Sequence, residues 1–461
     1  MTRMHRSCPA LPHRQHGAVI VLIVVALLAI LAMAALALDG GHLLVNKTRL
    51  QNAVDAAALS GAKTLSKVSG DPYGYLAATD DAQQTLVRNA QAAGNAELAR
   101  ALADAGGVER FIAVEFAEQV QGPFSYPGPL DARYVRVAAG NYPLDGFFWG
   151  ILQAFGGGSV PVKAVAAMAT AGPSPTSAPC DLAPLVVCGV PQPGSYYGYR
   201  FGELNVLKTA ANDEGISNGN YQLLDFGNGA KAVGEQLAGG GTLCPEIGRQ
   251  VPTKPGNTVG PAISGLNTRM NEYAGSFKGS KPTYPPDLVV DYALIGSGNN
   301  QRPALSLDAG GTVVYGADNQ NPGVPVSSDS AGNIHYQDPA TASRVELFDY
   351  HDWKAASDAC LLDAGQCTDG GVFERRILKV VVGNCTGLTG GATEVPVLGF
   401  GCFFLVQPGV HTGGDAQIFG QFISECEGDG VAGPNPVEDV GPQIIQLYKT
   451  YPAPGAPGTD S

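Results

Sequence analysis

The stretch of this 461-residue chain that most resembles a reactive centre is Asp349–Trp353, which reads DYHDW. A histidine flanked by carboxylates can coordinate a metal ion or act as an acid and a base. Neighbouring side chains on a strand point to opposite faces, so these groups would not converge on one site. We therefore expect a polar surface turn here and no catalytic centre.

Several well-defined catalytic motifs are missing from the sequence. It contains no Gly-x-Ser-x-Gly nucleophile elbow, no His-Glu-x-x-His zinc motif and no Walker phosphate loop. The glycine runs at 156–158 and 239–241 are not placed as phosphate loops, and we interpret them as loop glycines. We predict no catalytic, cofactor-binding or metal-binding residue, and hence a protein that is not an enzyme and needs no cofactor.

The nine cysteines are distributed unevenly along the chain. Cys8 lies near the N-terminus, and the other eight all follow Pro179. An even set of this kind predicts disulfides formed in an oxidising compartment, and no Cys-x-x-Cys or Cys/His cluster favours zinc. The disulfide candidates are Cys180, Cys188, Cys244, Cys360, Cys367, Cys385, Cys402 and Cys426.

The pairing of these eight cysteines does not follow from the sequence, because eight cysteines allow about 105 connectivities. Pairs that are close in the chain are the simplest expectation. We therefore expect Cys180 to pair with Cys188 and Cys360 with Cys367.

An apolar stretch near the N-terminus, Ala18–Leu38, contains no charge, amide or proline. As a helix its 21 residues span roughly 32 Å, close to the ~30 Å hydrocarbon core of a bilayer. The residues before it include Arg3, Arg6 and Arg14 and no acidic residue. By the positive-inside rule we expect the N-terminus to stay in the cytoplasm and the C-terminal bulk to lie on the outer side of the membrane. We expect a single-pass membrane protein that contacts the lipid bilayer through Ala18–Leu38.

Two processing alternatives remain open for this stretch. Ala35-Leu36-Ala37 would suit a signal peptidase, although the apolar run is longer than the usual 7–15 residues of a signal peptide. Cleavage of the pilin type after Gly17 would ask for glutamate five residues later, where this chain has Leu22. We favour an uncleaved signal anchor.

The helical pattern continues beyond Gly40-Gly41. From Leu43 to Leu65 apolar residues recur at three- and four-residue steps with one seven-residue gap, which predicts one apolar stripe on a continuing helix. Small residues four apart allow another helix to approach closely, and this helix packs either on its own domain or on a neighbouring membrane protein. The predicted helix-packing seam consists of Leu50, Ala53, Val54, Ala57 and Gly61.

Two aspartates on this segment are candidates for a catalytic role, but each has a simpler structural interpretation. Asp39 directly follows the apolar stretch, where we expect it to mark the membrane boundary and a helix end. Asp55 lies in an alanine-rich run, where it can cap the helix or pair with a basic side chain.

The sequence from Gly17 to Ala62 resembles the N-terminal region of TadE/TadG-like Flp pilus-assembly proteins. The resemblance is carried by a basic N-terminus, a membrane helix opening Gly-Ala, the motif LDGG and the run LQNAVDAAALSGA from Leu50 to Ala62. It covers about a tenth of the chain. It implies a single-pass inner-membrane protein with a periplasmic body that serves a tight-adherence pilus machine, and partners among other envelope or pilus-assembly proteins.

The resemblance does not extend to the adhesion domain that several TadG-type proteins carry. That domain binds a metal through Asp-x-Ser-x-Ser, and the nearest stretch here is Ser328–Gly332, which reads SDSAG. It lacks the final serine and no apolar strand precedes it, so we reject a metal-dependent adhesion site.

Residues 67–172 predict a small α+β domain. Asp80–Ala105 is a helix divided near Gly94, and strands are expected at Glu109–Glu118, Ala132–Ala139 and Val160–Ala171. Phe147–Leu152 reads as a short buried helix or turn.

Residues 180–461 predict a β-rich, disulfide-bonded domain of short strands between glycine, proline and asparagine turns. The fold class is therefore α+β, with one N-terminal transmembrane helix continuing into a periplasmic helix. The expected order is a basic tail at 1–16, the membrane and juxtamembrane helix at 17–66, the small α+β domain at 67–172, a Pro/Ser linker at 173–179 and the β-rich domain at 180–461.

The formal net charge of −13 argues against nucleic acid and anionic membrane surfaces as partners, and no small-molecule substrate is indicated. The leading hypothesis is a structural or assembly component of a Flp-type pilus or related secretion machine. The alternative is a secreted or anchored envelope module whose disulfide-bonded domain binds a ligand or surface polymer.

Overall fold

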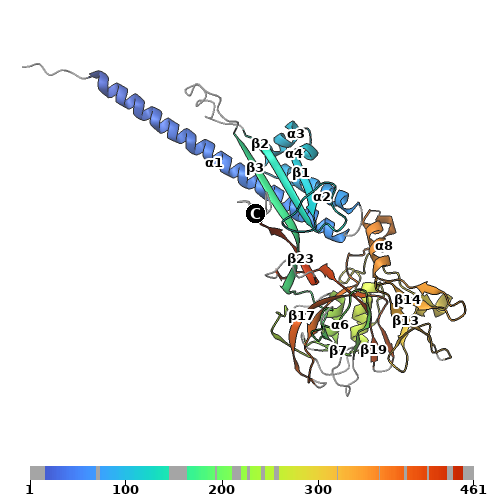
Figure 1. Ribbon diagram of the computed structural model, residues 1–461. Helices are drawn as coiled ribbons and strands as arrows, with labels where there is room; N and C mark the ends of the chain where they lie inside the picture. Colours follow the sequence, from blue (N-terminus) through green and yellow to red (C-terminus); the bar gives the residue numbers. More distant parts are fainter. Residues whose placement is uncertain are drawn as a thin grey trace, which may run out of the picture. The chain divides into compact units, whose positions relative to one another are not determined.

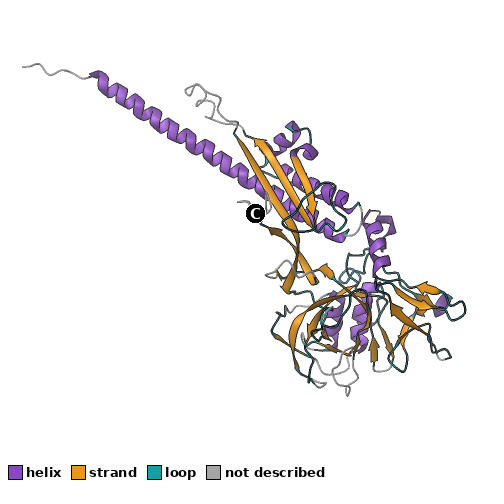
Figure 2. Ribbon diagram, viewed as in Figure 1, coloured by secondary structure: helices purple, strands orange, loops and turns teal. Residues whose placement is uncertain are grey.

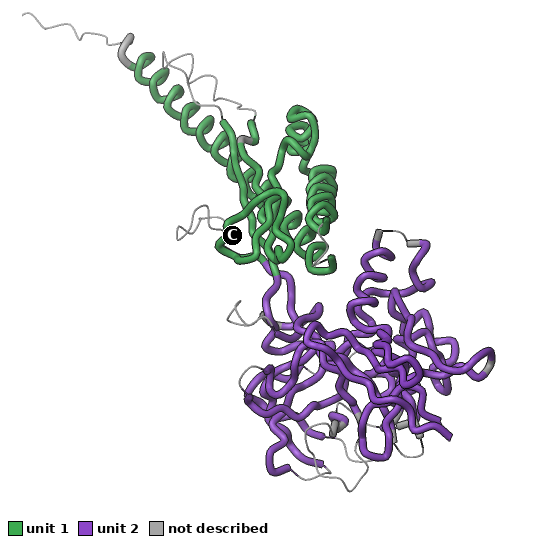
Figure 3. The backbone as a smooth tube through the Cα atoms, turned by 45° about the vertical axis from the view of Figure 1, so that its right-hand side comes forward, with its two compact units in different colours: residues 1–172, 447–461 green, residues 173–446 purple. Residues whose placement is uncertain are grey.

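The chain forms two compact units in the computed structural model, and each is described by itself (Figure 3). Unit 1 comprises Met1–Gly172 and Leu447–Ser461, and unit 2 comprises Pro173–Gln446. The structure describes residues 16–68, 73–144, 163–192, 195–209, 220–225, 229–239, 244–253, 259–318, 320–362, 364–388, 392–412, 415–432 and 440–449. The basic tail and the expected helix or turn at Phe147–Leu152 lie outside these residues.

Unit 1 is built on one helix of 52 residues, α1 (His16–Lys67) (Figure 1). Its first half is apolar and exposed, and among the described helices it is the one long and apolar enough to cross a membrane. Its second half, from Leu50 onward, is amphipathic and supplies part of the core of the unit. The expected helix end at Asp39 is wrong, because the helix runs through Asp39 and Gly40-Gly41 without a break.

The rest of unit 1 packs on this second half of α1. Three antiparallel strands form its sheet in the order β1-β2-β3, and Val137 of the central strand faces Val114 on one side and Ala169 on the other. The elements are α2 (Gly74–Gln91), α3 (Ala96–Asp104), α4 (Val108–Phe111), β1 (Ile112–Ala117), β2 (Tyr134–Pro143) and β3 (Ala164–Ala178). The division of the expected helix near Gly94 and the three strands are confirmed, with shifted ends.

The five residues of the predicted helix-packing seam are all buried inside this chain. A Cβ placed on Gly61 would lie 3.1 Å from the Ala78 carbonyl oxygen and 3.2 Å from the Ala82 Cβ, both on α2, and 3.4 Å from Val135 of β2. Glycine at this position therefore allows α1 to approach α2 closely. The sequence left open whether this helix packs on its own domain or on a neighbouring membrane protein. In the structure the seam residues pack on their own domain.

The expected linker at 173–179 is mostly strand. Residues 173–178 form the second half of β3, in which Ala171, Ser174 and Thr176 are buried. Proline can occupy a strand position whose backbone donates no hydrogen bond to a neighbouring strand. The composition of this segment does not show which positions these are, so it predicted a linker. Both β3 and β23 (Gly441–Tyr448) begin in one unit and end in the other.

Unit 2 is β-rich, as expected (Figure 2). It centres on an eight-stranded sheet in the order β5-β20-β17-β16-β4-β7-β6, with β8 also paired to β17. The strands of this sheet are β4 (Leu185–Cys188), β5 (Leu204–Val206), β6 (Lys208–Thr209), β7 (Asn220–Leu223), β8 (Gln250–Pro252), β16 (Ile377–Gly383), β17 (Glu394–Leu405) and β20 (Phe419–Ile423).

A five-stranded antiparallel meander follows the order of the chain. It comprises β11 (Leu305–Leu307), β12 (Val313–Tyr315), β13 (Val324–Ser328), β14 (Ile334–Gln337) and β15 (Arg344–Glu346). The remaining elements of unit 2 are α6 (Ala230–Gly239), α7 (Val259–Asn267), α8 (Tyr350–Leu362), β9 (Leu294–Ile295), β10 (Arg302–Pro303), β18 (Val410–Thr412), β19 (Asp415–Gln417), β21 (Glu425–Glu427), β22 (Val431–Ala432) and four short 3-10 turns.

The central strands of the large sheet are buried on both faces. On β17, Phe403 packs in the cluster that includes Val233 of α6, and Phe404 packs in the cluster that includes Trp353 of α8. Burial on both faces explains why these strands read as continuous apolar runs and do not alternate with polar residues.

Four disulfides join the eight cysteines of unit 2: Cys180–Cys244, Cys188–Cys385, Cys360–Cys367 and Cys402–Cys426. The expected Cys360–Cys367 pair is confirmed, and the expected Cys180–Cys188 pair is wrong. Strands β4 and β16 are parallel with Cys188 opposite Gly383, so Cys188 ends beside Cys385. This pairing depends on sheet register, which spacing along the chain does not contain.

We predict that the disulfides with the longest and the shortest loops, Cys188–Cys385 and Cys360–Cys367, differ in their contribution to stability. Replacing Cys188 and Cys385 by serine opens a loop of 197 residues, and chain entropy sets the loss at up to about 5 kcal/mol. Replacing Cys360 and Cys367 opens a loop of 7 residues, for up to about 2 kcal/mol. Urea denaturation of the two double variants measures both values, and equal losses would contradict the assignment.

We also predict that Gly61→Leu destabilises unit 1 by about 1–3 kcal/mol, because its side chain overpacks the α1–α2 contact. Gly41→Leu is the matched control on the same helix, since a Cβ there meets nothing within 4 Å. Thermal unfolding of the full chain in detergent, followed by circular dichroism, compares the two. A Gly61→Leu variant as stable as Gly41→Leu would contradict close packing of α1 against α2 at this position.

Candidate functional site

Four ionisable side chains form a continuous set where the apolar half of α1 ends, and we call them the ionic chain: Asp39, His42, Glu97 and Lys163. Asp39 and Lys163, which precedes β3, are each only 4 % exposed. The Lys163 Nζ donates to Asp39 Oδ1 at 3.1 Å and lies 3.0 Å from His42 Nδ1. The His42 Nε2 lies 2.8 Å from a carboxylate oxygen of Glu97 on α3.

The donors of the ionic chain fix the form of its histidine. A lysine ammonium only donates hydrogen bonds, so His42 Nδ1 accepts from Lys163. The ring proton is then on Nε2, which donates to Glu97.

Local structure explains why these groups meet. Asp39 and His42 are three residues apart on α1 and so share one face of the helix. Glu97 lies in the first turn of α3, where a carboxylate is favoured by the helix dipole. Burying the Asp39 carboxylate is costly without a cation, and Lys163 supplies one.

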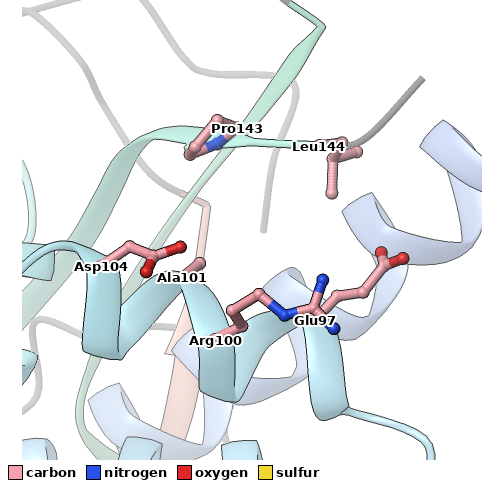
Figure 4. A pocket seen from close by; sticks show the side chains of 6 residues that line it. All are labelled: Glu97, Arg100, Ala101, Asp104, Pro143 and Leu144. Atoms are coloured by element: carbon pink, nitrogen blue, oxygen red, sulfur yellow. The ribbon is translucent and has the colours of Figure 1, made fainter.

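A cavity of about 130 Å³ lies next to this set, on the side of Glu97. Figure 4 shows its lining, with Arg100, Ala101 and Asp104 on the same face of α3 as Glu97, opposite Pro143 and Leu144 at the end of β2. The lining holds two carboxylates and one guanidinium, whose charges partly cancel. It offers no arrangement of nucleophile, base and oxyanion donors.

The other concentration of buried charge is in unit 2 and is structural. The fully buried Arg376 guanidinium donates to the carbonyl oxygens of Val289, Asp291, Leu405 and Val406. Burial lowers the pKa of Arg376 to about 9. These bonds join segments far apart in the chain.

Asp287 completes this buried cluster. Its carboxylate accepts from the Trp353 indole at 2.8 Å and from the Arg376 backbone amide at 2.8 Å. Burial raises the pKa of Asp287, and the nearby Arg376 guanidinium and the hydrogen bonds lower it in part. These donors and acceptors join segments of unit 2 that are far apart in the chain.

The prediction of a polar surface turn at Asp349–Trp353 is wrong, because this stretch begins α8. The Asp349 carboxylate caps the helix at the His351 amide and also accepts from the Ile334 amide of β14. Trp353 is 1 % exposed and points to Asp287, whereas the exposed His351 ring lies beside the Ala331 carbonyl. The side chains diverge, so they form no catalytic set.

The rejected adhesion motif at Ser328–Gly332 is a hairpin turn between β13 and β14. Its Asp329 carboxylate accepts from the Ala331 and Asn333 amides and pairs with Arg344. The hydrogen bond from Arg344 is the largest of the causes that lower the pKa of Asp329. This carboxylate is thus engaged within the meander.

The remaining predicted residues have these positions. The five seam residues lie in the core of unit 1, and the eight cysteines form the disulfides of unit 2. Asp55 accepts from the Gln51 side chain one turn away, at 2.8 Å. Within the described ranges, no group of three His, Cys, Asp or Glu side chains is placed to hold a metal ion.

Sequence reasoning missed Lys163 as the partner of Asp39, and it missed His42 and Glu97 as the other members of the ionic chain. The available signal was Asp39 itself, since a carboxylate that is buried where an apolar stretch of helix ends needs a cation. Nothing in the spacing identifies that cation, which is 124 residues away.

We predict that Lys163→Met lowers the stability of unit 1 by about 3–5 kcal/mol, because it removes the cation beside a buried carboxylate. The double variant Asp39→Leu, Lys163→Met recovers most of this loss, since it removes both charges together. Thermal unfolding of the full chain in detergent measures the series. A double variant no more stable than Lys163→Met would contradict the pairing.

The comparisons with known proteins agree with the N-terminal resemblance. The sequence model of the TadE/G-like Flp pilus-assembly family matches residues 17–64. No curated protein and no solved structure matches the chain. The matched residues fall within α1 and include the whole seam, Asp39 and His42. Residues 17–64 of this chain therefore match the model of the TadE/G-like Flp pilus-assembly family.

Proposed function

We propose that this protein is a membrane-anchored periplasmic component that positions or braces parts of a Flp-type pilus or a related secretion machine. The observation that carries the proposal is the coincidence of the TadE/G-like match at 17–64 with the long apolar helix α1. The apolar first half of the matched segment can enter a bilayer, and the rest of the two units is proposed to contact other proteins.

Anchoring in the membrane is supported by the exposed side chains of α1. The large apolar residues from Val19 to Leu38 are about half to three-quarters exposed, so the described part of the chain supplies little cover for them. Burial of apolar surface is favourable by about 25 cal/mol per Å², and a bilayer offers that burial to a lone helix.

Inner-membrane placement with the bulk in the periplasm is supported by two independent features. Arg3, Arg6 and Arg14 precede the apolar segment without any acidic residue, which favours a cytoplasmic N-terminus. The four disulfides of unit 2 favour an oxidising compartment on the other side.

The work of this protein is proposed to be contact and not catalysis. Unit 2 is held by four disulfides and by the buried Arg376–Asp287 cluster, which suits a body that presents a fixed surface. Its partners are proposed to be other envelope or pilus-assembly proteins.

Deleting the gene in the native host tests the proposal. We expect assembled surface pili to be lost while pilin is still made, and the full-length chain to restore them. Normal pili in the deletion strain would contradict the assembly role.

Two variants of the rescuing chain separate anchoring from mere export. A chain whose residues 19–38 are reordered keeps the hydropathy of the span, and we expect it to restore pili. A chain released into the periplasm by a cleaved signal peptide is expected to fail. Full rescue by the released chain would contradict the need for an anchor.

A further inference from the structure

The exposed surface of α1 stays uncharged for seven residues beyond Leu38. Gly41 is exposed, Leu44 is 64 % exposed and Val45 is 47 % exposed. The two ionisable residues in this interval, Asp39 and His42, belong to the ionic chain, and the His42 side chain is 14 % exposed. The next charged side chain along the helix is Lys47.

The length of this uncharged surface matches a whole bilayer. From Val19 to Val45 there are 27 residues, or about 40 Å of helix. A bilayer measures about 40–45 Å with its headgroup layers included and about 30 Å without them. The helix that ends at Leu38 is long enough to span the hydrocarbon core alone. The helix that ends at Val45 is long enough to span the hydrocarbon core and the headgroup layers.

Pairing within the ionic chain lowers the cost of placing the part of α1 beyond Leu38 in the membrane. A charge near the hydrocarbon boundary is costly unless it is paired. Asp39 and Lys163 are each 4 % exposed and bonded to one another, so the surface that α1 presents there is apolar. The pairing explains how an aspartate can lie inside the membrane zone of the helix.

The end of β2 and the start of β3 lie at this same level. The Leu144 amide donates to the Lys163 carbonyl at 2.8 Å, and Lys163 reaches Asp39. This end of the sheet of unit 1 therefore lies beside Asp39 of α1.

We propose that the membrane surface meets this protein at Val45–Lys47 and not at Asp39. The exposed face of α1 that carries Gly41, Leu44 and Val45 then contacts the lipid headgroup layer, and unit 1 rests directly on the membrane. The proposal rests on the membrane anchoring proposed above and adds the depth of insertion and a second lipid contact.

Nitroxide labels in the full chain test this depth. Single cysteines replace Leu31, Leu44 or Ser66 in a Cys8→Ser background, and all three positions are exposed, so the labels do not disturb the core. The labelled protein is reconstituted in nanodiscs of phosphatidylethanolamine and phosphatidylglycerol. Collision with oxygen reports lipid contact, and collision with a water-soluble nickel chelate reports contact with water.

We expect the oxygen-to-nickel accessibility ratio at Leu44 to approach that at Leu31 and to exceed that at Ser66 several-fold. A ratio at Leu44 equal to that at Ser66 overturns the proposed depth. A label at Leu44 shielded from both reagents also overturns it, because a second copy or another protein then covers this face.

Leu31 separates failure of this inference from failure of the anchor. If Leu31 reports lipid while Leu44 reports water, the helix is anchored and the membrane ends near Asp39. If Leu31 itself reports water, the proposed anchoring fails, and the depth of insertion fails with it.

Discussion

A carboxylate buried where the apolar half of a helix ends must be neutralised where it lies, and this requirement organises unit 1. Asp39 lies between the exposed apolar half of α1 and its amphipathic half. Its cation, Lys163, comes from the start of β3, so the ion pair fixes one end of the sheet against the helix. His42 and Glu97 extend the same connection to α3.

The two halves of α1 therefore lie in different environments. Its first half presents large apolar side chains outward, and its second half presents small residues inward, where Gly61 permits close contact with α2. Because the helix is continuous through Gly40-Gly41, unit 1 is built directly on the end of the apolar span. A rigid link of this kind suits a protein that positions its partners relative to a membrane.

Patterns that are local in the sequence predicted this structure well. The apolar stretch, the three-and-four spacing that ends at Leu65 and the division near Gly94 depend on neighbours within a few turns, and each has its expected element. The Cys360–Cys367 pair is local in the same sense.

Features set by distant contacts were not predictable in this way. The register of β4 against β16 determines the partner of Cys188, and the position of β3 determines the partner of Asp39. The stretch at Asp349 looked polar and exposed, but the Ile334 amide and the buried Trp353 make it the start of a packed helix. Single-sequence reasoning carries no information on such pairings.

The most direct test of the membrane-anchored, outward-facing arrangement uses the native Cys8, which precedes the apolar segment, while the other eight cysteines form disulfides. Spheroplasts that make a Ser66→Cys variant are treated with a membrane-impermeant maleimide. The account predicts labelling at residue 66 at once and at Cys8 only after the membrane is permeabilised. Labelling of Cys8 in intact spheroplasts, or protection of residue 66, would contradict it.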